Sequence, residues 1–150
     1  LGLLSSEPDD PKLIQTLLDM MHQDGTDFTL TFRKLCEAML EDNDINNVQN
    51  LFGDPISFKK WAEEWKSRLN REKQSPSARV ELMRQNNPLF IPRNHNVENT
   101  LTAAIDENNY GPFEQLLNVL LDPYSENTGF FKYINPPNPR DQYYQTFCGT

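Results

Sequence analysis

The sequence predicts an all-α fold of about seven helices in an irregular bundle, followed by an extended C-terminal tail rich in proline and aromatic residues. Two observations predict the helices. Apolar residues recur three and four positions apart, and the intervals between these runs carry residues typical of helix starts and ends. In addition, no segment alternates apolar and polar residues for long enough to indicate a strand. We therefore expect a helical domain in residues 1–123 and the tail in residues 124–150.

The first two predicted helices have clear boundaries. Asp9, Asp10 and Pro11 indicate a helix start, because a carboxylate accepts hydrogen bonds from free N–H groups and proline suits the first turn. Gly25 indicates the end of this helix, and Asp27 can cap the next one. Their apolar stripes are Leu13, Ile14, Leu17, Leu18 and Met21, then Phe28, Phe32, Leu35, Cys36 and Met39. We expect the two helices to form an antiparallel hairpin.

The fourth predicted helix is the longest. Its inward residues are expected to be Phe58, Trp61, Ala62, Trp65 and Leu69. Its outward residues are expected to be Lys59, Lys60, Glu63, Glu64, Arg68 and Glu72, with weak surface pairs between Lys59 and Glu63 and between Glu64 and Arg68. The tryptophans share one face, which is more typical of a core or an inter-domain contact than of a ligand site.

Four shorter patterns predict the remaining helices. The third has Ile45, Val48, Leu51 and Phe52 before Gly53. The fifth starts at Ser75 and Pro76, carries Val80, Leu82 and Met83, and ends before Pro88 and Pro92, because proline lacks the N–H that a helix needs. The sixth starts at His95 or Asn96 and buries Val97, Leu101, Ala104 and Ile105. The seventh follows Gly111 and Pro112 with Phe113, Leu116, Leu117, Leu120 and Leu121.

The tail has no helical periodicity, and Pro136, Pro137 and Pro139 argue against a helix there. Its aromatic residues are too many for a free tail: Phe130, Phe131, Tyr133, Tyr143, Tyr144 and Phe147. We expect the tail to pack across the helices or onto a partner domain.

Composition bears on partners and location. A formal charge of -8 and a pI near 4.7 argue against a nucleic-acid partner. No run approaches the roughly 18 apolar residues that cross a bilayer, so we expect no membrane association. Leu1 in place of methionine indicates a start inside a longer polypeptide, and two cysteines fit a reducing compartment such as the cytoplasm.

Charge is unevenly distributed along the chain. Residues 56–94 hold nine basic and four acidic side chains, whereas residues 1–55 hold three and eleven and residues 95–150 hold two and seven. The band 56–94 either docks an acidic partner or forms a solvated helix face.

The residues predict no catalytic, cofactor-binding or metal site. The six glycines form no phosphate loop, and His22, Cys36, His95 and Cys148 are too scattered to indicate a zinc site or a Cys–His pair. Cys36 lies on an apolar stripe and is expected in the core. Cys148 lies near the end of the chain, where a thiol stays accessible, and it is our redox candidate.

The proline-flanked segment Asn87–His95 is either a rigid elbow between helices or an edge of an interface or substrate site. Arg93 can pair with a carboxylate, and Asn94 can cap the following helix.

Four segments closely resemble the C-terminal part of selenoprotein O-like proteins. They are DGTDFTLTFR (24–33), NPLFIPRNH (87–95), FEQLLNVLLDPY (113–124) and YQTFCGT (144–150). The resemblance implies a pseudokinase-fold protein adenylyltransferase that moves AMP from ATP to Ser, Thr or Tyr of target proteins with Mg or Mn. No motif for those tasks is present here. The resemblance thus implies a non-catalytic accessory region whose partners are the upstream pseudokinase domain and the protein substrates.

The resemblance also concerns Cys148, which stands where animal relatives have selenocysteine in a Cys-x-x-selenocysteine ending. Gln145 stands where the first cysteine of that pair would be, so a local redox couple cannot form. The partner of a Cys148 disulfide is then Cys36, another chain, or a cysteine of the upstream kinase-like part. We favour the last, because such a link could gate activity.

Overall fold

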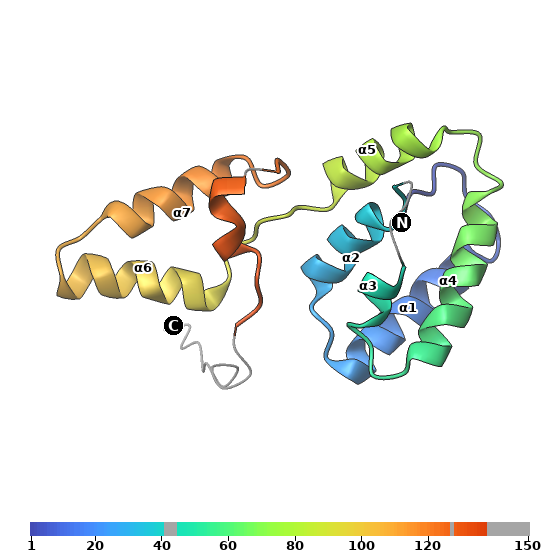
Figure 1. Cartoon of the computed structure of the whole chain (residues 1–150), viewed down its shortest axis with the longest axis horizontal. Helices are drawn as coiled ribbons and strands as arrows, with labels where there is room; N and C mark the ends of the chain where they lie inside the picture. The colour runs from blue at the N-terminus through green and yellow to red at the C-terminus, as the bar shows by residue number, and fades with distance from the viewer. Residues whose placement is uncertain (41–44, 127, 138–150) are drawn as a thin grey trace. The chain divides into compact units, whose positions relative to one another are not determined.

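The computed structural model describes residues 1–40, 45–126 and 128–137, and within them it contains only helices and connecting segments (Figure 1). The α-helices are α1 (Asp10–Asp24), α2 (Phe28–Glu37), α3 (Asn46–Gln49), α4 (Pro55–Leu69), α5 (Pro76–Asn86), α6 (Asn94–Asp106) and α7 (Gly111–Leu121). The 3-10 helix η1 spans Thr128–Tyr133. The predicted all-α fold is confirmed. In the described part of the chain, no helix has the length and apolarity that crossing a membrane requires.

The chain divides into an N-terminal unit, Leu1–Asn87, and a C-terminal unit, Pro88–Thr150. This boundary lies inside the region 1–123 that was expected to be one helical domain. In the described part of the expected tail, residues Thr128–Tyr133 form η1 where extended chain was predicted. Residues 138–150 lie outside the described residues, so the rest of the tail prediction stays a prediction.

Side-chain caps set several helix starts. The Asp27 carboxylate accepts a 2.7 Å hydrogen bond from the Leu30 N–H at the start of α2, and the Ser75 hydroxyl accepts from Ala78 N at the start of α5. Asp54 accepts from Ile56 N and from Ser57 N at the start of α4. At the C-terminal end of α1, Gly25 adopts a left-handed φ of 62°.

The core of the N-terminal unit is organised by the aromatic face of α4. Trp61 and Trp65 stack with ring centroids 5.5 Å apart, and both side chains are buried. α1 packs on α4, while α2 packs on α5 and α3. The predicted hairpin of the first two helices is therefore wrong. The apolar stripe of α1 packs on α4 instead, where the Trp61 ring also bonds the Leu13 carbonyl.

In the C-terminal unit, α6 and α7 pack against each other (Figure 1). The buried apolar residues of its described part are Leu89, Phe90, Leu116, Val119 and Tyr133. Leu101 and Ile105 were expected in the core, but their side chains are 41% and 78% exposed. On α7, Phe113, Leu117 and Leu121 are exposed as well. The burial prediction is wrong at Leu101 and Ile105, because each helix buries only one side of a wider apolar stripe.

Candidate functional site

In the described part of the N-terminal unit, a buried group of charged side chains centres on Arg68, near the end of α4. Arg68 lies seven residues after Trp61 and three after Trp65, so the helix places it on the tryptophan face. Its residue surface is 3% exposed. The prediction that Arg68 faces solvent and pairs with Glu64 is wrong, because its guanidinium turns inward to carboxylates brought by other segments.

The Arg68 guanidinium binds the start of α1 in a two-pronged geometry. Nε donates to Asp10 Oδ1 at 2.7 Å, and Nη2 donates to Asp10 Oδ2 at 3.1 Å. Nη1 donates to Glu72 Oε1 at 2.8 Å and lies 3.3 Å from Glu7 Oε1. Nη2 also donates to the Ser5 carbonyl at 2.8 Å. Each nitrogen of the guanidinium thus has an oxygen partner, which suits a buried arginine.

Further contacts surround Arg68 and its carboxylate partners. Arg71 donates to both Glu7 oxygens, with an Nη2–Oε2 distance of 2.7 Å. The Ser5 N–H and hydroxyl both donate to Glu72 Oε1. We call Ser5, Glu7, Asp10, Arg68, Arg71 and Glu72 the Arg68 network. It contains two guanidinium groups and three carboxylates.

Hydrogen bonding in the network favours the charged form of each group. The bond from Arg68 lowers the pKa of Asp10, the bonds from Arg71 lower the pKa of Glu7, and the bond from Ser5 lowers the pKa of Glu72. The Asp10 carboxylate in turn raises the pKa of Arg68. Proton transfer needs a group with a pKa near the working pH. The network is therefore suited to holding segments together rather than to acid–base chemistry.

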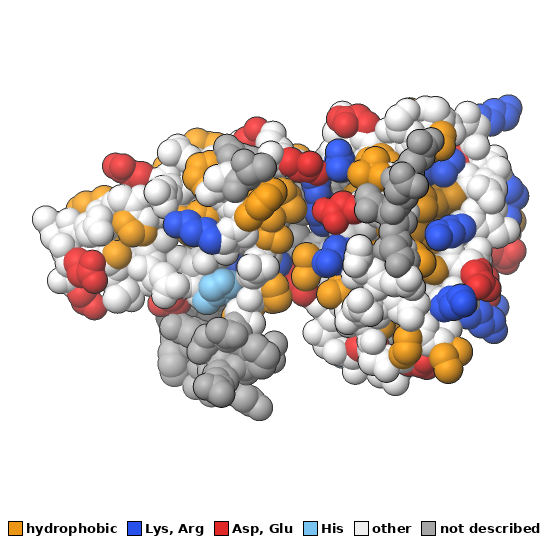
Figure 2. All heavy atoms as spheres, viewed as in Figure 1, with side chains coloured by type: hydrophobic (Ala, Val, Ile, Leu, Met, Phe, Trp, Pro, Cys, Tyr) orange, Lys and Arg blue, Asp and Glu red, His pale blue; other side chains and the backbone are white. Residues whose placement is uncertain are grey.

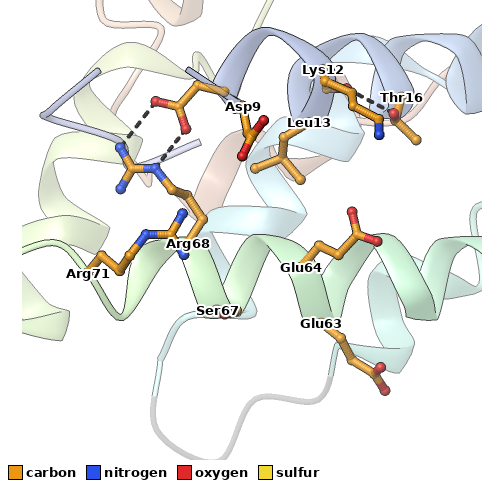
Figure 3. A pocket seen from close by; sticks show the side chains of 10 residues that line it. Asp9, Lys12, Leu13, Thr16, Glu63, Glu64, Ser67, Arg68 and Arg71 are labelled. Atoms are coloured by element: carbon orange, nitrogen blue, oxygen red, sulfur yellow. Dashed lines mark hydrogen bonds and ion pairs between the residues drawn. The ribbon is translucent and has the colours of Figure 1, made fainter. Parts of the chain in front are cut away.

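An open pocket lies beside the network, between α1 and α4 (Figure 3). Asp9 and Glu64 extend into the space between the helices, whereas Glu63 is directed away from it. Lys12 and Ser67 line the same pocket and are exposed. The pocket is a solvated polar groove, and the Arg68 side chain beneath it is already bound to protein oxygens.

The N-terminal segment is held at further points by α4 and α5. Trp65 Nε1 donates to the Leu1 carbonyl at 3.0 Å, and Trp61 Nε1 donates to the Leu13 carbonyl at 2.9 Å. Gly2 has a φ of 78°, and a Cβ atom there would lie 2.9 Å from Arg79 Cγ. With the Arg68 network, these contacts form what we call the N-terminal clamp, which fixes residues 1–13.

The structure gives the predicted candidates different surroundings. Trp61 and Trp65 belong to the core and the clamp. Arg93 is buried at the N-cap position of α6, where its carbonyl accepts from Asn96 N and Val97 N. Asn94 is the first residue of α6 rather than its cap, so that capping prediction is wrong. Cys148 lies outside the described residues.

Sequence reasoning missed the Arg68 network and the glycine at position 2. A signal for Arg68 exists, because positions 61, 65, 68 and 72 follow one helical face. Nothing in the sequence pattern marks the carboxylates that reach Arg68 from the N-terminal segment.

Burial also changes the interpretation of the basic band 56–94. Of its nine basic residues, Arg68, Arg79 and Arg93 are buried, and Arg71 is paired with Glu7. The Arg79 Nη2 donates to the Leu69 carbonyl inside the unit. The band 56–94 thus exposes fewer unpaired basic side chains than its count of nine basic residues indicates.

Neither the Arg68 network nor any other described cluster fits a resident metal ion. In residues 1–40, 45–126 and 128–137, no three His, Cys, Asp or Glu side chains converge as metal ligands would.

Comparison with known proteins identifies the family. The family model described as protein adenylyltransferase SelO matches residues 1–121. The chain therefore belongs to the SelO family, and the resemblance inferred from the four sequence segments is confirmed.

Similar curated proteins are named protein nucleotidyltransferase YdiU. One from Rhodopseudomonas palustris strain ATCC BAA-98 / CGA009 is 43% identical, one from Bradyrhizobium sp. strain ORS 278 is 45% identical, and one from Rhizobium etli is 41% identical. Each match covers 100% of this chain and 30% of the relative. The matched part is the C-terminal part of those proteins. The chain thus spans less than a third of the length of these relatives.

Proposed function

We propose that this chain is a helical accessory region that buttresses the catalytic part of a protein adenylyltransferase. In this proposal, the polypeptide that precedes the matched region in the relatives binds ATP with Mg or Mn. That polypeptide transfers AMP to Ser, Thr or Tyr of target proteins. The partners of the chain are that upstream pseudokinase domain and, through it, the protein substrates. Bacterial relatives support a bacterial cytoplasm as the location.

The N-terminal clamp is the observation that carries the proposal. Trp65, Arg68 and Asp10 fix the segment from Leu1 to the start of α1 by side-chain bonds. In the relatives, about 70% of the chain precedes the matched region. A clamp at this point gives the preceding polypeptide a fixed attachment, which a flexible linker would not provide.

The experiment uses the R. palustris relative in three forms: intact, truncated before its matched region, and as a chimera in which this chain replaces that region. We expect truncation to lower thermal stability and AMP transfer, and the chimera to recover both. A truncated form as stable and active as the intact protein would contradict the proposal. So would micromolar ATP binding by this chain alone in calorimetry.

The second candidate function is a protein-interaction module that docks acidic partners through the band 56–94. Its support is the exposed lysines Lys59, Lys60, Lys66 and Lys73. Burial of three arginines of the band weakens it. Salt-sensitive retention of acidic protein substrates by this chain alone would favour this function over the buttress.

A redox role for Cys148 is a further part of the proposal. Cys36 is a poor partner, because burial raises the pKa of its thiol and disfavours the reactive thiolate. Its Sγ donates to the Phe32 carbonyl and accepts a bond from Asn87 Nδ2. These observations support a partner outside this chain. Non-reducing peptide mapping of the chimera that finds Cys148 always free would remove the redox role.

A further inference from the structure

The C-terminal unit leaves apolar side chains at its surface on both of its long helices. Leu101 and Ile105 on α6, and Phe113, Leu117 and Leu121 on α7, form what we call the α6–α7 apolar surface. The exposed fractions reach 78% at Ile105 and 73% at Leu121. Figure 2 shows hydrophobic side chains at the surface of the unit that contains these helices. Large apolar side chains exposed on two helices that pack against each other favour an interaction site.

The spacing of these residues indicates a continuous ridge on each helix. Residues 101 and 105 are four apart, and residues 113, 117 and 121 are four apart in turn, so each set follows one side of its helix. The same helices bury Thr100, Leu116 and Val119 inside the unit. In the part of the chain that the structure describes, each helix therefore has a buried side and an adjoining side with exposed apolar residues.

Charge distinguishes between possible occupants. Acidic residues follow the ridges directly: Asp106 after Ile105, Glu114 after Phe113, and Asp122 after Leu121. These acidic side chains are exposed. Two copies of the surface placed face to face would bring these like charges together, which disfavours self-association. An occupant with an apolar centre and a basic border fits better.

We propose that the α6–α7 apolar surface docks the polypeptide that precedes the matched region in the longer relatives. This inference rests on the proposed function and names the surface through which the buttress acts. The relatives supply a large additional chain, since this chain covers 30% of their length. The interface buries the ridges of both helices, and basic side chains of the catalytic part lie against Asp106, Glu114 and Asp122.

Cysteine labelling in the R. palustris chimera and in this chain alone tests the surface. The variants are Ile105→Cys and Leu121→Cys, one on each helix. The matched control is Ile56→Cys, because Ile56 is 81% exposed on α4. Alkylation by N-ethylmaleimide is followed over time at each site by peptide mass spectrometry.

We expect both test positions to react readily in this chain alone and to be protected by at least about tenfold in the chimera, a factor that corresponds to about 1.4 kcal/mol. The control position should react equally in both proteins. Labelling of either test position at the same rate in the chimera as in the chain alone would overturn the inference. Protection already present in the chain alone would overturn it too, because residues 1–87 or a second copy would then cover the surface.

Failure of the surface and failure of the proposed function give different results. A chimera that recovers stability and AMP transfer while both test positions stay reactive keeps the buttress and rejects this surface. A chimera that recovers neither property rejects both proposals. If a cysteine variant misfolds, hydroxyl-radical footprinting of Phe113 and Leu117 in the unsubstituted chimera and in the chain alone gives the same comparison.

Discussion

Arg68 shows at the scale of a single residue why a charged side chain belongs in this core. Hydrogen bonds to its N–H groups and a balancing negative charge offset the cost of burying a guanidinium. Asp10 supplies the two-pronged partner, and Glu72 and Ser5 complete the bonding. Removing the cation leaves carboxylates facing one another, which makes the network sensitive to both substitution and pH.

The Arg68→Met substitution should lower the free energy of unfolding by about 2 kcal/mol at neutral pH, because it removes several charge-assisted hydrogen bonds and leaves Asp10 unpaired. Arg71→Met is the matched control. Arg71 is exposed, and surface ion pairs contribute little. Urea denaturation of the two variants measures the difference. Equal losses in the free energy of unfolding in the two variants would show that the buried Arg68 pairs stabilise the fold no more than the exposed Arg71 pair.

The same network predicts a pH dependence. Because the pKa values of Asp10 and Glu7 are lowered in the folded state, their stabilising contribution is complete above the ordinary values of 3.8 and 4.5. It is lost as the pH falls below those values toward the lowered folded ones. The difference in stability between wild type and Arg68→Met should therefore shrink on acidification. Denaturation curves across this range check the sign, and a difference that grows on acidification would contradict it.

Gly2 carries a separate prediction, because two constraints meet there. Its φ of 78° disfavours a side chain, and a Cβ would lie 2.9 Å from Arg79 Cγ. Gly25 has a φ of 62° but no heavy atom within 4 Å of a Cβ. We expect Gly25→Ala to cost about 1 kcal/mol and Gly2→Ala to cost about 2 kcal/mol or more. Thermal melts of the two variants separate the effect of backbone strain, at Gly25, from the effect of strain plus steric overlap with Arg79, at Gly2. Equal losses of stability would exclude a contribution from the overlap.

At the scale of the elements, local signals in the sequence predicted most of the helix boundaries. Asp27, Ser75 and Gly25 lie where the predicted starts and ends require them. These signals act within a few residues, so the sequence displays them directly. The pairing of α1 with α4 and the inward turn of Arg68 depend on segments far apart in the chain. For that reason neither could be predicted from spacing alone.

The cap of α5 allows a direct test at this scale. The Ser75 hydroxyl accepts from Ala78 N at 3.2 Å, and Ser75→Ala removes that acceptor. We expect a loss of about 1 kcal/mol in the free energy of unfolding. Ser67→Ala is the control, since Ser67 is an exposed residue inside α4, where alanine is the better helix former. A loss at Ser67 equal to that at Ser75 would show that capping is not the cause.

For the whole molecule, the main difference from the sequence-based expectation is the unequal burial in the two units. In the described residues, the N-terminal unit has a buried cluster that includes Phe58, Trp61, Trp65 and Leu69, whereas the C-terminal unit buries a smaller set. Leu101 and Ile105 have the spacing of core residues but remain exposed. Periodicity reports that an apolar stripe needs a partner, and it does not report whether the partner lies in the same chain.

This inequality predicts two unfolding transitions. Each large apolar side chain contributes roughly 1.5–3 kcal/mol when buried, so the C-terminal unit should unfold first in this chain. Both tryptophans lie in the N-terminal unit, so their fluorescence reports that unit alone, whereas circular dichroism reports the helices of both. We expect the dichroism to fall at lower urea concentrations than the fluorescence changes. Amide hydrogen exchange should likewise be faster in α7 than in α4. Coincident transitions with equal protection would contradict the prediction.

If the α6–α7 apolar surface docks the catalytic part, the amide groups of α7 should gain protection from exchange in the chimera. Those of α4 should change little, because the interior of the N-terminal unit is already filled.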